Sequence, residues 1–210
     1  LTGVTGSVNV DLLTIDLTGV ELFVGAGGVF TTNSTVDTSN ATGFYVSNAE
    51  LHLGIMSVTN PNPAGAPVDT RKWTGIAAKA DGLTVVGMPS DFDIEVNNLK
   101  VLFNKAAGTS GGGTPESAQP IDWSAVISDT ANPLHDLTGD TALAVSGAVK
   151  LNLGGYVMVA GSFALAKSSQ TGVNLTGVTD PVNVDLLSID LTGVELFVGA
   201  GGVFTSNSTV

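Results

Sequence analysis

The chain has 210 residues, a formal net charge of −12 and no cysteine. The missing cysteines exclude disulfides, zinc–thiolate sites, iron–sulfur clusters and cysteine nucleophiles. Seven basic residues, the first of them Arg71, are too few to bind the phosphates of a nucleic acid, and an anionic membrane would repel this surface. Divalent cations are the partners that the charge permits.

The first predicted element is a strand at 14–30, "TIDLTGVELFVGAGGVF". Its apolar residues recur two apart, with one step of three at Thr18-Gly19; they are Ile15, Leu17, Val20, Leu22 and Val24. A period of two predicts a strand with one buried face. The step of three predicts a β-bulge or sharp bend, because an extra residue would otherwise turn the following side chains to the wrong face.

Further elements follow the same scheme of alternation, a Gly or Asn, then alternation again. We predict such bent strands at 49–58, 93–103 and 149–165, and a plain strand is favoured at 73–88. Two stretches dense in turn residues, 59–72 and 104–120, are predicted loops. Residues 122–136 predict one short helix, with Asp122 as N-cap and Pro133 beyond its end.

The end of the chain repeats its beginning. Residues 175–210 match residues 1–36 at 32 of 36 positions, without a gap. A fixed offset of this kind is typical of a tandem array. We therefore interpret 1–174 as one complete repeat and 175–210 as the beginning of the next. The opening "LTGV" has neither Met nor a basic leader, so we expect a piece of a longer chain.

Strand signals without alternating helices predict an all-β fold. Two architectures fit. The first is an elongated β-solenoid or long-stranded β stack that continues between tandem repeats, and the alternative is a string of β-sandwich domains. The boundary between the repeats contains only "KSSQTG" as polar linker, which favours the continuous form.

Carboxylates form the main candidate constellation. Asp91, Asp93 and Glu95 alternate with apolar residues and are expected to share one strand face. Other acids are Asp136 and Asp140, which bracket "LTG", and three that recur in both copies: Asp11, Asp16 and Glu21 as Asp185, Asp190 and Glu195. None matches an EF-hand or a calcium-binding nonapeptide repeat. We interpret them as a solvated polar face and assign no metal ligand, although calcium is the one cofactor that these acids would suit.

Other candidate motifs are weaker. "GTSGG" at 108–112 places Ser110 in a nucleophile-elbow pattern but runs into a sequence that cannot begin a helix. His52 and His135 are too few for a three-histidine metal site and are interpreted as structural or solvated. "GAGGVF" at 25–30 lacks the third glycine of a dinucleotide-binding turn. Four Asn-X-Ser/Thr triplets are close to chance in so Thr-rich a chain. We predict no catalytic and no cofactor-binding residue.

Three phrases, "LTGVELFVGAGGVF", "DGLTVVGMPSDFDIEVNNLKVLFN" and "AVSGAVKLNLGGYVMVAGSFAL", resemble the β-strand repeats of giant bacterial surface and secreted proteins of the adhesin or haemagglutinin kind. The resemblance is one of style and spacing, and no functional residue can be transferred from it. It implies an extracellular or cell-surface, repetitive, all-β protein.

These observations favour a structural role. We expect a repeat unit of an extracellular filament or giant surface adhesin that associates with neighbouring repeats or copies of itself through β-structure. The alternative is a sugar- or calcium-dependent binding module, in which Trp73 or Trp123 would lie in a loop beside the acids and contact a surface glycan. A β-helical polysaccharide-cleaving enzyme is a remote third. We predict that the protein is not an enzyme.

Overall fold

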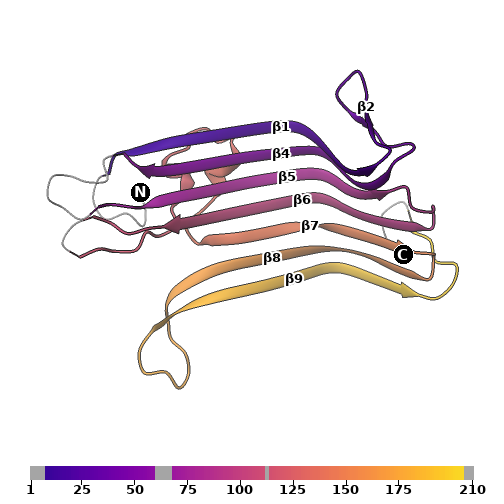
Figure 1. Cartoon of the computed structure of the whole chain (residues 1–210). Coiled ribbons are helices and arrows are strands. Elements are labelled where there is room, and N and C mark those ends of the chain that lie inside the picture. Colours follow the sequence, from indigo (N-terminus) through magenta and orange to yellow (C-terminus); the bar gives the residue numbers. More distant parts are fainter. Residues whose placement is uncertain (1–7, 60–67, 112–113, 206–210) are drawn as a thin grey trace.

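The computed structural model describes residues 8–59, 68–111 and 114–205, and most of them form one open antiparallel sheet (Figure 1). Its seven strands, in spatial order, are β1 (Val10–Ala26), β4 (Thr42–Val58), β5 (Lys72–Val86), β6 (Phe92–Ala107), β7 (Thr141–Leu153), β8 (Val157–Val173) and β9 (Val182–Val198). Two short strands, β2 (Val29–Phe30) and β3 (Val36–Asp37), form a separate hairpin. The prediction of an all-β fold is confirmed.

The order of the strands in the large sheet follows their order in the chain. Every neighbouring pair is antiparallel, from β1 with β4 to β8 with β9. Such a meander needs only short reversals between most strands. The connection from β1 to β4 contains the β2–β3 hairpin, and the longest connection, from β6 to β7, contains the 3-10 helices η1 (Trp123–Ala125) and η2 (Pro133–Asp136).

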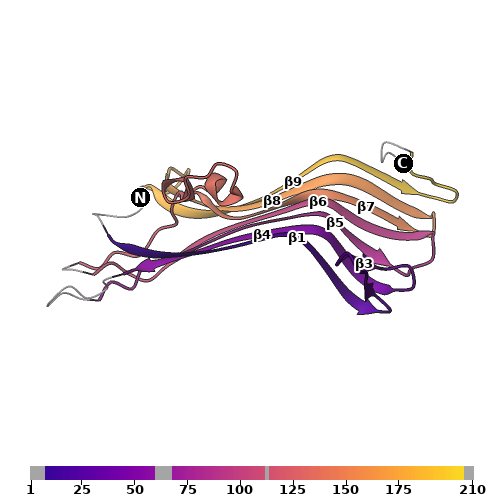
Figure 2. The ribbon, with the colours of Figure 1, turned by 90° about the horizontal axis from the view of Figure 1, so that it is seen from above.

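The strands bend together near their middles, as Figure 2 shows. The register of β1 against β4 shifts between Leu17 and Val20, and that of β6 against β7 shifts between Asn97 and Lys100. Left-handed backbone conformations occur near the bend in four strands: at Gly19 in β1, Asn48 in β4, Asn98 in β6 and Gly193 in β9. Gly and Asn tolerate that conformation better than other residues. The bulge predicted at Thr18-Gly19 and the one at Asn97-Asn98 are confirmed.

Two other predicted bends are wrong. The register runs unbroken through Gly54, which pairs with Thr14 on one side and Gly75 on the other. At Gly154-Gly155 the chain reverses instead of bending, because two consecutive glycines with positive φ close the hairpin between β7 and β8. Residues 149–165 therefore span parts of two strands.

The region around the predicted helix also differs from expectation. Asp122 is an N-cap as predicted, and its side chain accepts a hydrogen bond from the backbone of Ser124. The helix itself is wrong, because two short 3-10 helices replace it and Pro133 begins the second. Pro at a first helical position fits its fixed φ. The predicted loop at 104–120 begins later than expected, since β6 continues to Ala107.

Strand alternation sorts the side chains of the sheet onto two faces. One row across the sheet is Leu17, Leu51, Ala78, Val101, Val145, Leu165 and Ile189, and we call this side the apolar face. The adjacent row is Asp16, His52, Ala77, Leu102, Ala144, Ala166 and Ser188, and we call that side the polar face.

The main core lies on the polar face, where the β6–β7 connection packs against one end of the sheet. Trp73 from β5 and Trp123 from η1 are both fully buried there with Met56. The Trp123 indole lies directly over Gly54 and Gly75, where an added Cβ would come within 2.4 Å and 2.5 Å of the ring. Gly54 therefore makes room for an indole.

Buried hydrogen bonds hold the same connection in place. Nδ2 of Asn104 donates to the backbone oxygens of Ile121 and Thr138, each at 2.8 Å, and its Oδ1 accepts from Nε1 of Trp123 at 3.1 Å. All three polar contacts of this buried amide are thus made within the protein, as burial requires.

Candidate assembly interface

The acidic side chains that share a strand face are paired with a lysine. Asp93 and Glu95 both approach Nζ of Lys150, at 3.3 Å and 3.6 Å, whereas Asp91 lies before the first residue of β6. The face shared by Asp93 and Glu95 is therefore confirmed, but Asp91 does not belong to the strand. Within residues 8–59, 68–111 and 114–205, no group of three or more His, Asp or Glu side chains is placed to hold a metal ion.

The two histidines occupy different surroundings. His52 is buried on the polar face, where its Nδ1 lies 2.6 Å from Oδ1 of Asp16. His135 lies 3.6 Å from the carboxylate of Asp136. His135 and Asp136 both belong to η2. A helical turn brings the side chains of adjacent residues closer together than an extended chain does, in which they point to opposite sides. Asp136 and Asp140 are both exposed.

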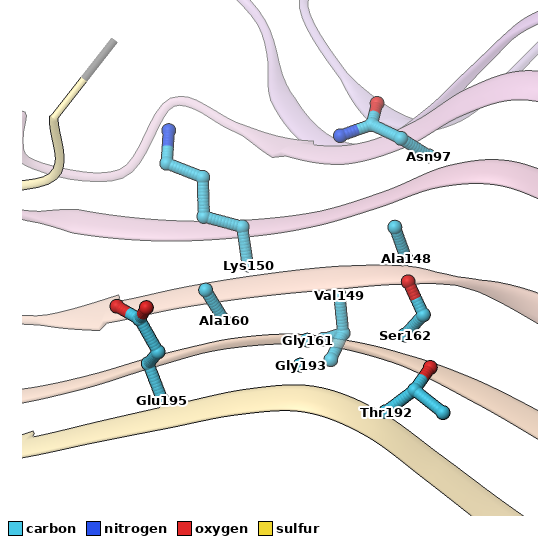
Figure 3. A pocket seen from close by; sticks show the side chains of 10 residues that line it. All are labelled: Asn97, Ala148, Val149, Lys150, Ala160, Gly161, Ser162, Thr192, Gly193 and Glu195. Atoms are coloured by element: carbon cyan, nitrogen blue, oxygen red, sulfur yellow. The ribbon is translucent and has the colours of Figure 1, made fainter. Parts of the chain in front are cut away.

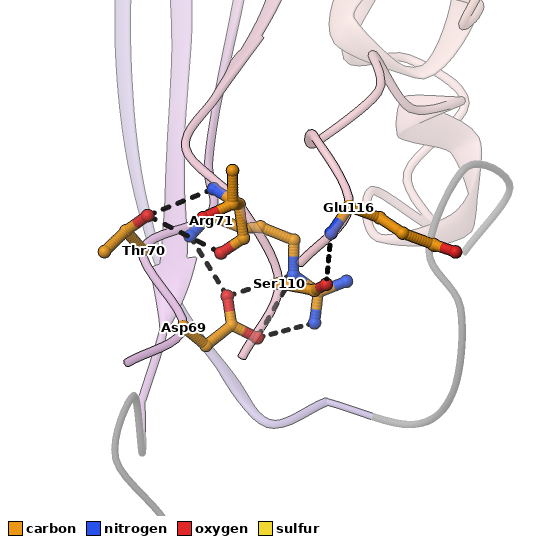
Figure 4. Close-up of polar contacts among 6 residues, drawn as sticks. Asp69, Thr70, Arg71, Ser110 and Glu116 are labelled. Atoms are coloured by element: carbon orange, nitrogen blue, oxygen red, sulfur yellow. Dashed lines mark hydrogen bonds and ion pairs between the residues drawn. The ribbon is translucent and has the colours of Figure 1, made fainter. Parts of the chain in front are cut away.

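Ser110 belongs to a network that ties two loops together at the end of the sheet (Figure 4). Its hydroxyl accepts a hydrogen bond from the backbone of Glu116, and Asp69 makes a bidentate pair with Arg71 with a shortest contact of 2.6 Å. The hydrogen bonds from Arg71 hold the pKa of Asp69 below its ordinary value, against the opposing effect of burial. Ser110 thus has a structural partner. Gly112, the last residue of the elbow pattern, lies outside the described residues.

The two copies of the repeated segment lie at opposite edges of the sheet. β1 is one edge strand and β9 is the other, with five antiparallel strands between them. Because each step across the sheet reverses direction, β1 and β9 run in the same direction. Their backbones also match, since φ is 62° at Gly19 and 59° at Gly193, and 83° at Gly27 and 81° at Gly201.

The first acid of the repeated strand, Asp11 in β1 and Asp185 in β9, has a partner only in the copy that lies beside β8. Asp185 in β9 accepts a hydrogen bond of 2.9 Å from the Ser169 hydroxyl, and its other oxygen lies 3.3 Å from Nζ of Lys167. The two contacts lower the pKa of Asp185. Its counterpart Asp11 lies in the edge strand β1 and has no such partner among the described residues.

The second acid shows the reverse pattern. Asp16 in β1 contacts His52 and accepts a 3.3 Å hydrogen bond from Nδ2 of Asn132, both from its own repeat. Its counterpart Asp190 in β9 has no hydrogen bond or ion pair with any residue that the structure describes. In each copy of the strand, therefore, one of the two acids has a partner: Asp185 beside β8, and Asp16 beside β4 and the β6–β7 connection.

The segment after the repeated strand is also held differently in the two copies. Beyond β9, the backbone nitrogen of Gly199 donates to Tyr156 at 2.9 Å, and the ring of Phe204 lies 5.0 Å from Nζ of Lys150. The counterpart of Phe204 in the first copy is Phe30, which is 77% exposed. Phe30 follows the edge strand β1, and β7 with its lysine is four strands away from β1 in the sheet.

A pocket of about 300 Å³ lies on the polar face, over β6, β7, β8 and β9, and Figure 3 shows the side chains around it. Asn97, Lys150 and Ser162 come from β6, β7 and β8, whereas Thr192 and Glu195 come from the repeated strand β9. The corresponding residues of the edge strand β1 are Thr18 and Glu21, and Glu21 accepts a hydrogen bond from the backbone of Val36 in β3. The pocket therefore forms only beside the second copy of the repeated strand among the described residues.

No family model, no curated protein and no solved structure matches this chain. None of the helices in the described residues is long and apolar enough to cross a membrane. The repeat places the acids at equivalent positions of β1 and β9, but their partners are on other strands and loops. Spacing alone carries no signal for such contacts.

Proposed function

We propose that this chain is a structural repeat of an extracellular filament or giant surface protein, and that successive repeats share one continuous antiparallel sheet. The observation that carries this proposal is the placement of the same strand at both edges, in the same direction and with complementary contacts. In an array, β9 is the first strand of the following repeat, and β1 receives β8 of the preceding one.

The number of strands in the repeat makes this continuation possible. One period contributes β1, β4, β5, β6, β7 and β8, an even number, so each new repeat begins in the same direction as the last. With about 4.8 Å between neighbouring strands, each repeat lengthens the sheet by roughly 29 Å. An odd number of strands would reverse every second repeat.

Contacts on both sides would set the register of the shared strand. Each residue of β9 is equivalent to the residue of β1 that lies 174 positions earlier. The β8–β9 pairs therefore place Ile15 opposite Leu165, and Asp11 opposite Ser169, of the preceding repeat. Lys167 of that repeat then pairs with Asp11, while His52 of the strand's own repeat pairs with Asp16. Paired edges also remove the aggregation hazard of exposed ones.

Charge and composition support a secreted, repetitive role. Residues 1–174 carry fifteen acids and seven bases, so each repeat adds −8. An array of such repeats is a polyanion that stays soluble by mutual repulsion, and divalent cations would bridge its surfaces. The role needs no catalytic group. Both Trp73 and Trp123 are fully buried, so neither offers a ring to a sugar.

Hydrogen exchange on β9 tests the proposal. In the chain of 210 residues the outward amides of β9 face solvent, whereas a chain with one further 174-residue period should pair them with the next β4. We expect exchange of these amides to slow by at least tenfold, while β6 at the sheet centre serves as the unchanged control. Equal exchange rates of β9 in both chains would contradict a shared strand.

A further inference from the structure

The apolar face of the sheet extends over all seven strands. Besides the row described above, it carries a second row of large side chains from one edge strand to the other, which includes Leu22, Val46, Leu83, Val96, Val149 and Leu196. The connection that contains η1 and η2 packs on the polar face, so it does not cover these residues. Ile55 is 39% exposed and Ile189 is 63% exposed.

The area of this face suits a stable interface. Seven strands about 4.8 Å apart, each roughly 50 Å long at 3.3 Å per residue, present on the order of 1,500 Å². Two such faces in contact would bury about 3,000 Å², which lies within the range of obligate homodimers. An exposed apolar patch on a monomer is typically several hundred Å².

The charges of the strands are arranged so that two such faces do not repel each other. Most strand acids lie on the polar face: Asp16, Glu21, Glu50, Asp93, Glu95, Asp190 and Glu195. Outside the bend, the apolar face carries two acids, Asp11 and Asp185, and three lysines, Lys72, Lys105 and Lys167. These five lie together at one end of the strands, where both signs are present. The surplus negative charge of the chain is thus directed away from this face.

We propose that a second copy of this chain covers the apolar face, so that two sheets pack face to face as a sandwich. In an array the apolar face recurs with every repeat. A second array of the same chain has the same spacing between its repeats, so the two series of faces match. Sheets that pack in this way lie about 10 Å apart with interdigitating side chains. A hollow lined by Ala49, Ala78 and Ala80 leaves space on this face for larger side chains of an opposing sheet. The contact adds lateral pairing to the proposed structural role and does not depend on strand sharing.

Sedimentation of the chain of 210 residues tests this inference separately from growth at the edges. We expect a dimer at micromolar concentration, and we expect Val101→Lys at the centre of the apolar face to convert it into a monomer with unchanged circular dichroism. The matched control is Lys100→Glu, one residue away on the opposite face, which should remain dimeric. If Val101→Lys unfolds, the more exposed Ile189→Lys replaces it.

A disulfide provides a second, independent measurement. The chain has no cysteine, so Val101→Cys introduces the only thiol. Oxidation should crosslink this variant into a dimer, whereas Lys100→Cys should stay monomeric. A wild-type monomer at micromolar concentration, or a dimer that survives Val101→Lys, would overturn the proposal. So would a monomer that binds phosphatidylcholine vesicles, because a lipid surface would then be the occupant.

Discussion

Asp11 and Asp185 occupy the same place in the repeated strand but meet different neighbours. Asp185 contacts Lys167 and Ser169, whereas Asp11 lies in the edge strand β1 and has no such partner among the described residues. We expect Asp185→Asn to speed amide exchange in β9, because it removes an ion pair that helps to hold an edge strand. Exchange mass spectrometry at low and high salt measures this, and the effect should shrink at high salt. The matched control, Asp11→Asn, should leave exchange in β1 unchanged.

The second acid should show the opposite asymmetry. Asp16→Ala removes the hydrogen bond to the buried His52, and we expect it to lower the free energy of unfolding by about 1 kcal/mol. Asp190→Ala alters the same position of the other copy and should have no measurable effect in this chain. Equal effects of Asp16→Ala and Asp190→Ala in denaturant titrations would mean that the two edges are not complementary.

Asp69 provides a pH-dependent test at the end of the sheet. Its pKa is lowered in the folded protein by the hydrogen bonds from Arg71. A carboxyl with a depressed folded pKa stabilises the fold above its unfolded pKa, and this stabilisation is lost as the pH falls through the folded value. We therefore expect Asp69→Asn to be less stable than wild type at neutral pH. The difference should close in acid, below the ordinary pKa of Asp of about 3.9. A difference that is constant with pH would rule out this ion pair as the cause.

At the scale of the elements, the packing of η1 on the sheet depends on glycines in two neighbouring strands. We expect Gly75→Ala to destabilise the fold by about 1–3 kcal/mol, because the new methyl group would meet the Trp123 ring. Gly82→Ala in the same strand is the control, since its nearest atom is the Ser47 hydroxyl at 3.3 Å. Thermal unfolding compares the two variants, and equal losses would contradict a specific role for Gly75.

Strand periodicity predicted most of β1 and β5 and the bulges at Thr18-Gly19 and Asn97-Asn98, although β1 begins and ends four residues earlier than the predicted strand at 14–30. It failed at Gly54 and Gly154-Gly155, because a glycine serves equally as a bulge, a turn or a place for another side chain. Trp123 explains Gly54, and that contact joins residues far apart in the sequence. The candidate interface was less predictable. The repeat was visible, but which edge each copy occupies depends on the order of the strands.

At the scale of the whole molecule, the sheet formed by the described residues has two edges without a further strand and an apolar face without a packing partner. Repeats joined at the edges would form a ribbon, and two ribbons joined face to face would bury their apolar side chains. The polar faces, with most of the strand acids and the packed connections, would then point outward. Such a filament would be acidic on its surface and apolar within, as expected for a soluble structural protein.

The most direct test of the shared sheet is the length added by each repeat. Chains with one, two and three 174-residue periods can be compared by electron microscopy and small-angle scattering. A continuous sheet with six strands per repeat predicts a rigid particle that lengthens by about 29 Å for each added repeat. A flexible string of separate particles, or a length that does not increase in these steps, would contradict the account.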